Sequence, residues 1–134
     1  MRRFGVAIFV LFAVLALHSG QASALEVPKA PRLETPIVDQ TGTLTGEQLK
    51  LLADQIATSR KEKDYQIGVL IISTLGNGEY LEGYSLKVAR QWGIGEKDKS
   101  NGVLLLVVID DRDLRIEVGR GLEGDLTDVR SNQI

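Results

Sequence analysis

Two long apolar runs constrain the fold more than any other feature of the chain. Residues 66–73 and 102–109 consist mostly of Ile, Val and Leu, with few polar side chains among them. Continuous apolar runs of this length are typical of strands that are buried on both faces. A sheet of such strands has to be covered by helices, so the pattern predicts an α/β fold.

Two segments with helical periodicity can supply this cover. A helix is predicted after Thr45, because Thr45 and Gln48 have the spacing of a capping box and the residues that follow form one apolar face: Leu49, Leu52, Ala53 and Ile56. A second helix is predicted over residues 80–92, with Gly93 at the position where helices commonly end.

A third strand follows the second apolar run. Leu114, Ile116 and Val118 alternate with Arg115 and Glu117, and a tight link over residues 110–113 joins this strand to the preceding one as a hairpin. A short apolar piece at residues 37–38 precedes the first helix. We therefore expect an αβα sandwich: a small mixed sheet that includes a hairpin, with helices packed on its faces.

The N-terminus has the pattern of a signal peptide. Arg2 and Arg3 precede an apolar run over residues 6–17, and small residues follow at 22–24. The run is 12 residues long, whereas a retained membrane anchor needs roughly 20. We therefore predict a signal peptide over residues 1–24, cleavage after Ala24, and export to the periplasm or the extracellular space.

The predicted mature chain excludes several classes of chemistry. It loses the only histidine, His18, and the chain has no cysteine, so the softer metal ligands are missing. Residues 25–134 carry 14 basic and 18 acidic side chains, a net charge of −4 (14 − 18). An acidic chain of this kind argues against nucleic acid as a partner. Catalysis would have to rest on carboxylates, amides, hydroxyls and basic groups.

The mature chain divides into a short N-terminal segment and one domain. Residues 25–36 contain all three prolines and are interpreted as an extended tether between membrane and domain. Residues 37–134 form the predicted domain. Thr127 or Asp128 has the character of a helix N-cap, yet only a few residues follow, so we expect the domain to be incomplete at its C-terminus.

One glycine motif invites a nucleotide hypothesis. Residues 119–124 match G-x-G-x-x-G after a strand. The motif comes too late in the chain for a surrounding βαβ unit, and no acidic residue can follow about 20 positions later. Three acids, Glu123, Asp125 and Asp128, would also crowd a pyrophosphate. We therefore interpret the glycines as residues of a tight loop and predict no nucleotide ligand and no bound organic cofactor.

Acidic side chains gather at predicted strand ends. Asp39 follows the first short strand, Asp110 and Asp111 lie at the hairpin, and Asp125 and Asp128 follow the glycine loop. Strand ends are where α/β folds place sites, and Ca²⁺ takes six to eight oxygen ligands. Aspartate is also common in turns and helix caps, and spacing alone favours that interpretation.

The chain resembles the TPM domain family, which comprises bacterial envelope proteins and thylakoid-lumen proteins related to photosystem II repair. The resemblance covers about residues 36–128 and rests on these stretches: Val38-Asp39, Leu44-Thr45, Trp92-Gly93-Ile94-Gly95, Asn101-Gly102-Val103-Leu104-Leu105-Leu106, Asp110-Asp111-Arg112, Arg115 to Gly124 and Leu126-Thr127-Asp128. It implies an αβα sandwich, export, calcium binding in some members and acid phosphatase activity in some. The polar residues of the family's motifs correspond by position to Asp39, Asn101, Asp110, Asp111 and Asp128. The resemblance therefore implies these five residues as the metal ligands.

Two functions follow from these expectations. The first is an envelope module that binds a divalent cation, calcium, and acts through protein or membrane partners. The second is a metal-assisted acid phosphatase that hydrolyses phosphate monoesters. In the second, Asp110 or Asp111 would hold the cation or attack phosphorus, and Arg112 or Arg120 would neutralise phosphate oxygens. No nucleophile–base pair is evident, so the module is favoured and the question of enzymatic activity stays open.

Overall fold

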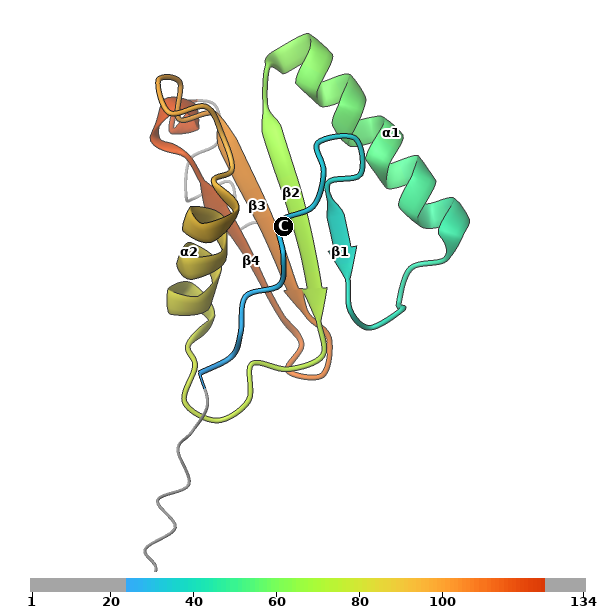
Figure 1. Cartoon of the computed structure of the whole chain (residues 1–134), viewed down its shortest axis with the longest axis vertical. Helices are drawn as coiled ribbons and strands as arrows, with labels where there is room; N and C mark the ends of the chain where they lie inside the picture. Colours follow the sequence, from blue (N-terminus) through green and yellow to red (C-terminus); the bar gives the residue numbers. More distant parts are fainter. Residues whose placement is uncertain (1–23, 125–134) are drawn as a thin grey trace, which may run out of the picture.

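A computed structural model of the chain describes residues 24–124 (Figure 1). Its elements are, in chain order, β1 (Ile37–Asp39), α1 (Gly46–Lys63), β2 (Gln66–Ile72), α2 (Leu81–Trp92), β3 (Gly102–Val108), β4 (Asp113–Val118) and the short 3-10 helix η1 (Arg120–Leu122). The two apolar runs are thus strands, and both helices lie where the sequence predicts them.

The four strands form one mixed sheet in the order β1-β2-β3-β4. β1, β2 and β3 run parallel, and β4 returns antiparallel to β3 as the predicted hairpin. In β2, the residues from Gly68 onward are buried, and most of β3 is buried as well. The prediction of a mixed sheet with a hairpin is confirmed.

The helices cover opposite faces of the sheet, as Figure 1 shows. On one face, Tyr84 and Val88 of α2 pack with Leu70, Leu104 and other side chains of β2 and β3 in the main core. On the other face, Ile56 of α1 packs with Val69 and Ile71 of β2. The αβα sandwich is therefore confirmed.

The start of α1 and the end of α2 show the local chemistry that the sequence predicts. The capping box of α1 is present: Thr45 accepts a hydrogen bond from the Gln48 amide, and the Gln48 side chain accepts one from the Thr45 amide. Helix α2 ends at Gly93, which has a left-handed backbone with φ of 61°. Glycine takes this conformation without steric cost.

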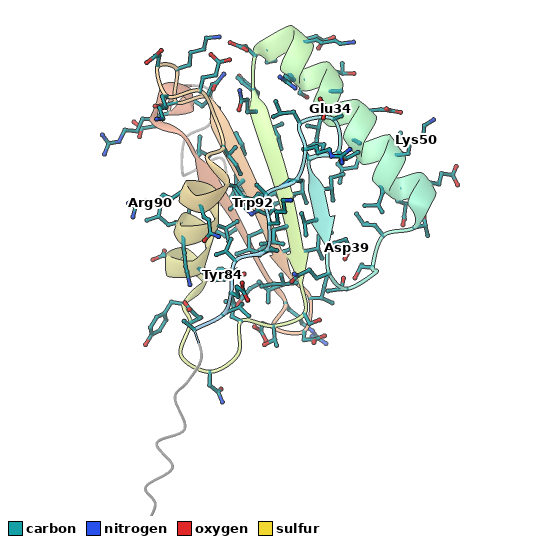
Figure 2. All side chains as sticks on the ribbon, viewed as in Figure 1. Glu34, Asp39, Lys50, Tyr84, Arg90 and Trp92 are labelled. Carbon is teal, nitrogen blue, oxygen red and sulfur yellow. The ribbon has the colours of Figure 1, made fainter. Side chains whose placement is uncertain are left out.

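The segment predicted as a tether is packed against the domain over part of its length. Val27 is buried in the main core, and three side chains of α2 donate hydrogen bonds to carbonyl oxygens of the segment. These bonds run from the Tyr84 hydroxyl to Glu26, from the Trp92 ring nitrogen to Pro28 and from Lys87 to Leu25, at 3.1, 2.8 and 3.2 Å. Figure 2 labels Tyr84 and Trp92 beside this segment. Residues 1–23 of the predicted signal peptide lie outside the described residues.

The hairpin strand β4 turns its polar side towards α2. Arg115 and Glu117 lie on that face, and the buried Ser85 hydroxyl of α2 donates a hydrogen bond of 2.6 Å to Glu117. The apolar side chains of β4 therefore point to the other face, where Leu114 is 47% exposed. Among residues 24–124, neither helix is both long enough and apolar enough to span a bilayer.

Candidate functional site

The carboxyl ends of three parallel strands lie at one edge of the sheet. Asp39 ends β1, Ser73 follows β2, and Asp110 and Asp111 follow β3 in the hairpin turn. Figure 2 shows Asp39 at this end of β1. Two strand spacings, about 10 Å, separate β1 from β3. The fold thus brings Asp39 and the Asp110–Asp111 pair to the same edge but not into direct contact.

The carboxylate of Asp39 organises the loop that follows it. Its Oδ1 atom accepts hydrogen bonds from the Thr41 amide, the Thr41 hydroxyl and the Gly42 amide at 2.9, 2.7 and 3.0 Å. Its Oδ2 atom accepts one from the Leu44 amide at 2.9 Å. A carboxylate has about four lone-pair sites. Asp39 is therefore a loop-organising residue: the lone pairs of Oδ1 are taken up, and Oδ2 keeps one lone pair.

These bonds also set the charge state of Asp39. Burial raises the pKa of the carboxyl, but the hydrogen bonds from Leu44, Thr41 and Gly42 together outweigh it, so the pKa lies below its ordinary value. A lowered folded-state pKa stabilises the protein fully above the unfolded-state pKa of about 4. The stabilisation is lost as the pH falls through the lower, folded-state value.

We predict that Asp39→Ala lowers the free energy of unfolding at pH 7 by about 2 kcal/mol, because several loop amides lose their acceptor. The difference between wild type and Asp39→Ala should shrink as the pH is lowered through the acidic range, since the wild-type carboxylate is then protonated as well. Urea unfolding of both proteins at pH 7 and in acid measures this. A difference that stays constant with pH would contradict the role given to the charged carboxylate.

Asp111 is held by the loop that leads into α2. Its carboxylate accepts hydrogen bonds from the Thr74 hydroxyl at 2.9 Å and from the Leu75 amide at 2.9 Å. The neighbouring Asp110 donates its amide to the Ser73 carbonyl at 2.8 Å. Within residues 24–124, no hydrogen bond or ion pair engages the Asp110 carboxylate, which is exposed. The hairpin thus presents two neighbouring carboxylates: that of Asp111, which is held by hydrogen bonds, and that of Asp110, which is free of them among the described residues.

Arg112 completes the hairpin turn. Its amide donates a hydrogen bond to the Ile109 carbonyl at 3.2 Å, and its backbone is left-handed, with φ of 58°. It is the one basic residue between β3 and β4, flanked by Asp110, Asp111 and Asp113. The turn therefore carries a local excess of negative charge.

Asn101 lies at the opposite edge of the sheet, directly before β3. It is 5% exposed, and its side chain links two loops: it accepts a hydrogen bond from the Glu96 amide at 2.8 Å and donates one to the Asp64 carbonyl. From the sequence, Asn101 lies at the opposite end of its strand from Asp110 and so can belong to a different edge, and the structure places it at the edge away from Asp110 and Asp111. Its amide is a buried connector between the end of α1 and the loop before β3.

The predicted ligand set is thus divided by the fold. Asp128 falls outside the described residues. Within residues 24–124, no three acidic side chains come close enough together to hold a metal ion. Of the predicted set, Asp110 and Asp111 are the adjacent pair at the strand edge, and their oxygens are of the type that Ca²⁺ prefers.

Two glycines of the G-x-G-x-x-G motif, Gly119 and Gly121, are explained by close backbone packing. A Cβ atom on Gly119 would lie 2.1 Å from the Ser100 carbonyl oxygen, and one on Gly121 would lie 1.9 Å from that of Lys99. The glycines let the chain after β4 press against the loop before β3, and η1 spans only three residues there. The protein's own backbone fills the space over these glycines, which agrees with the interpretation as a tight loop.

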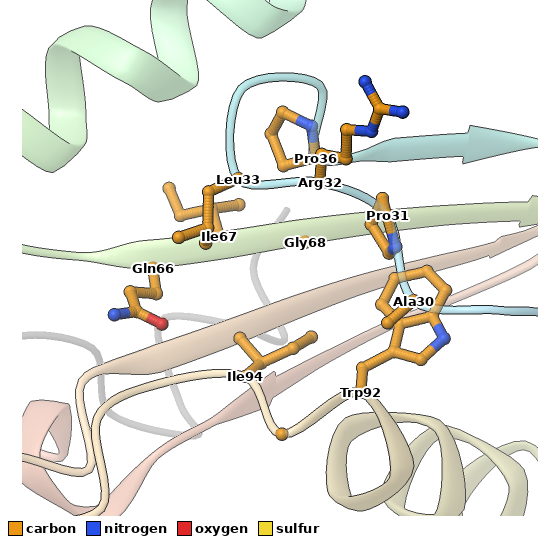
Figure 3. Close-up of a pocket in the computed structure, with 11 residues that line it drawn as sticks. Ala30, Pro31, Arg32, Leu33, Pro36, Gln66, Ile67, Gly68, Trp92 and Ile94 are labelled. Atoms are coloured by element: carbon orange, nitrogen blue, oxygen red, sulfur yellow. The ribbon is translucent and has the colours of Figure 1, made fainter.

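Two hollows lie away from the predicted acidic site. One is a cavity of about 70 Å³ between the N-terminal segment and the start of β2, lined by Pro31, Pro36, Gln66, Trp92 and Ile94 among others (Figure 3). Ligand pockets are usually several times larger. The other is an open groove between α2 and the end of β4, with both Arg90 and Glu117 in its lining. Neither hollow could be predicted from the sequence, because each is formed by segments that are separated in the chain.

Similar structures support the fold. The N-terminal domain of a protein from P. gingivalis is 33% identical, with a TM-score of 0.70, covering 75% of this chain and 64% of that one. The BA42 protein from Bizionia argentinensis is 22% identical, with a TM-score of 0.58, covering 68% and 61%. The N-terminal domain of cg2496 from Corynebacterium glutamicum is 16% identical, with a TM-score of 0.60, covering 82% and 69%. The chain spans less than two thirds of the length of the first two structures.

A comparison with curated proteins found no match. A family model described as the TPM domain matches residues 37–134, which begins at the first residue of β1 and includes the whole sheet. The matched region also contains every candidate ligand discussed above. By this match, and by the fold it shares with the P. gingivalis domain, the chain belongs to the TPM domain family.

Proposed function

We propose that the protein is an exported module of the cell envelope that binds a divalent cation, calcium, and acts through a protein or membrane partner. The cation is held at the carboxyl edge of the parallel strands, and Asp110 and Asp111 are its ligands from the hairpin. The observation that carries the proposal is the pairing of a free carboxylate, Asp110, with a held one, Asp111, at this edge.

The chemistry of this edge favours a hard cation. Asp111 is pre-oriented by Thr74 and Leu75, and its Oδ1 atom keeps a lone pair because the described contacts place only the Thr74 hydroxyl on it. Asp110 and Asp113 add charge that Arg112 balances only in part. Ca²⁺ relieves such repulsion and completes its shell of six to eight ligands with backbone carbonyls, water and further carboxylates. Asp128 is the further carboxylate that we propose.

Export and an envelope partner are proposed on separate grounds. The charged start, the 12-residue apolar run and the small residues at 22–24 have the order of a signal peptide. The absence of cysteine from the sequence also suits an oxidising compartment, since no thiol can be oxidised there. A domain with no enclosed pocket at its acidic edge, among the residues described, is better suited to surface binding than to enclosing a substrate.

The test is a thermal melt of the protein with Ca²⁺, with Mg²⁺ and with a chelator. A ligand that binds only the native state adds about 2.7 kcal/mol of stability at a hundredfold excess over Kd. We expect Ca²⁺ to raise Tm clearly and the chelator to abolish the rise. In Asp110→Asn the rise should disappear, while the melt without calcium stays near that of wild type, because the described structure gives this side chain no partner.

The matched control is Asp98→Asn, which removes one exposed negative charge from the loop before β3, at the opposite edge. It should keep the full calcium response. An equal loss of response in Asp98→Asn would mean that calcium acts through net charge alone. A flat response from cooperatively folded wild type would contradict the proposal and leave Asp110 and Asp111 as turn residues.

The alternative function is a metal-assisted acid phosphatase, and the label of the matching family model, TPM_phosphatase, contains the word phosphatase. Arg112 beside the aspartate pair is the feature that favours it, because a guanidinium neutralises phosphate oxygens. Against it, the hydrogen bonds from Thr74 and Leu75 stabilise the negative charge of the Asp111 carboxylate and so make it a weaker nucleophile toward phosphorus. Aryl phosphate hydrolysis that disappears in Asp110→Asn and Asp111→Asn, with the fold intact, would favour the phosphatase over the module.

A further inference from the structure

Strand β4 is an edge of the sheet, with β3 as its one neighbour among the described strands. The Gly119 amide donates a hydrogen bond to the Gly102 carbonyl at 2.7 Å. Counting back from Gly119, every second residue of β4 therefore forms hydrogen bonds with β3, and the residues between them do not. By this alternation, Arg115 and Glu117 direct their backbone groups to β3. Three residues direct theirs outward to the open edge: Leu114, Ile116 and Val118.

Charged and apolar side chains follow the same order on both sides of Ile116. On either side of it stand Arg115 and Glu117, of opposite charge, and beyond these stand the apolar Leu114 and Val118. If two copies pair antiparallel with Ile116 opposite Ile116, each Arg115 lies opposite Glu117 of the second copy. Leu114 then lies opposite Val118. All three outward residues form hydrogen-bonded pairs, which gives six backbone bonds at two per pair.

Neighbouring registers are poorer. Pairing centred on Arg115 would place Arg115 opposite Arg115 and Asp113 opposite Glu117, two kinds of like-charge contact. A shift of one strand by a single residue relative to the other would place apolar side chains opposite charged ones. A register centred on Leu114 would also set opposite charges across from each other, Asp113 and Arg115, but it would place Ile116 opposite Arg112, which lies in the hairpin turn with a left-handed backbone. Charge and backbone conformation together therefore favour the register centred on Ile116.

Within one copy, the two charged side chains already lie on the same face of β4 and contact each other. Arg115 contacts Glu117 on its own strand and Glu82 of α2, and Ser85 donates to Glu117. The Arg115 side chain stays 33% exposed and that of Glu117 19%. On the opposite face Leu114 is 47% exposed, since α1 packs against β2 rather than β4. Pairing would give Leu114 a cross-strand apolar neighbour.

We propose that β4 is a self-association surface, through which two copies of this chain pair their edge strands antiparallel about Ile116. The two four-stranded sheets then form one continuous sheet with twofold symmetry. The interaction is isologous: the same surface serves in both copies. It uses neither Asp110 nor Asp111 and is independent of calcium.

The test is sedimentation equilibrium of protein produced from the full 134-residue sequence, up to about 1 mM, the range of weak specific association. Wild type should dimerise. Arg115→Glu sets like charges opposite each other twice per dimer and should weaken association by roughly tenfold or more. The double change Arg115→Glu with Glu117→Arg restores both opposite-charge pairs and should restore association.

A second measurement does not depend on the stability of these charge variants. The chain has no cysteine, so Ile116→Cys introduces a single thiol on the proposed twofold axis. Oxidation or a short bifunctional thiol reagent should join two copies of Ile116→Cys but not of Leu51→Cys, whose parent side chain is 60% exposed on α1. Wild type that stays monomeric would overturn the proposal. A dimer that Arg115→Glu leaves intact, or that Ile116→Cys does not cross-link, would overturn it as well.

Discussion

Gly121→Ala should lower the free energy of unfolding by about 3 kcal/mol, the upper part of the range for forcing extra volume into a packed site. The added Cβ would lie 1.9 Å from the Lys99 carbonyl oxygen and 3.1 Å from that of Ser100. Both obstacles are backbone atoms, so no side-chain rotation relieves the clash. Either the loop before β3 or the chain after β4 has to move. The Gly121 amide would then lose its hydrogen bond to Ser100, now 3.1 Å.

Gly124→Ala is the matched control, since a methyl group added at this glycine of the same motif would have no atom of residues 24–124 within 4 Å of it. It should change stability by no more than about 0.5 kcal/mol, as surface substitutions usually do. Urea unfolding of wild type and both variants measures the difference. Equal effects of the two substitutions would contradict the packing explanation and reopen a ligand-binding role for the motif.

Asn101→Asp should destabilise the protein by about 3 kcal/mol, because it places a buried charge against a carbonyl oxygen. Asparagine accepts from the Glu96 amide and donates to the Asp64 carbonyl. Aspartate keeps the first bond and turns the second into a repulsive contact between two acceptors. A calcium ligand would behave in the opposite way, since a carboxylate binds the cation more strongly than an amide does.

Asn77→Asp makes the same chemical change in an exposed loop between β2 and α2 and should leave stability nearly unchanged. The comparison is read from thermal melts with and without Ca²⁺. A stabilisation of Asn101→Asp by calcium that exceeds that of wild type would contradict the structural role and restore Asn101 to the ligand set.

Most of the fold could be predicted from local patterns. The runs that became β2 and β3 are apolar on both faces, which only a covered sheet can accommodate. The capping box at Thr45 and Gly93 after Trp92 mark helix boundaries through contacts between near neighbours in the chain. Such signals are complete within a few residues, so they survive in the sequence. The packing of Val27 under α2 left no such signal, because it depends on residues about 60 positions away.

The candidate site was less predictable because the role of a carboxylate depends on its partners. Asp39 and Asp110 look alike in sequence, yet one carboxylate accepts four hydrogen bonds from its own loop and the other has no partner in the described chain. Asn101 is connected to Asp64, which lies 37 residues earlier. Only the assembled fold distinguishes a loop-organising acid from an available one.

An NMR titration of the isotope-labelled protein with Ca²⁺ locates the cation, because each backbone amide reports on its own surroundings. We expect saturable amide shifts in Ser73, Thr74, Leu75 and the hairpin turn around Asp110 and Asp111, with little change near Asn101. These shifts should be lost in Asp110→Asn and kept in Asp98→Asn. Shifts centred on the loop before β3, or none at all in the folded protein, would contradict a calcium site at the carboxyl edge of the sheet.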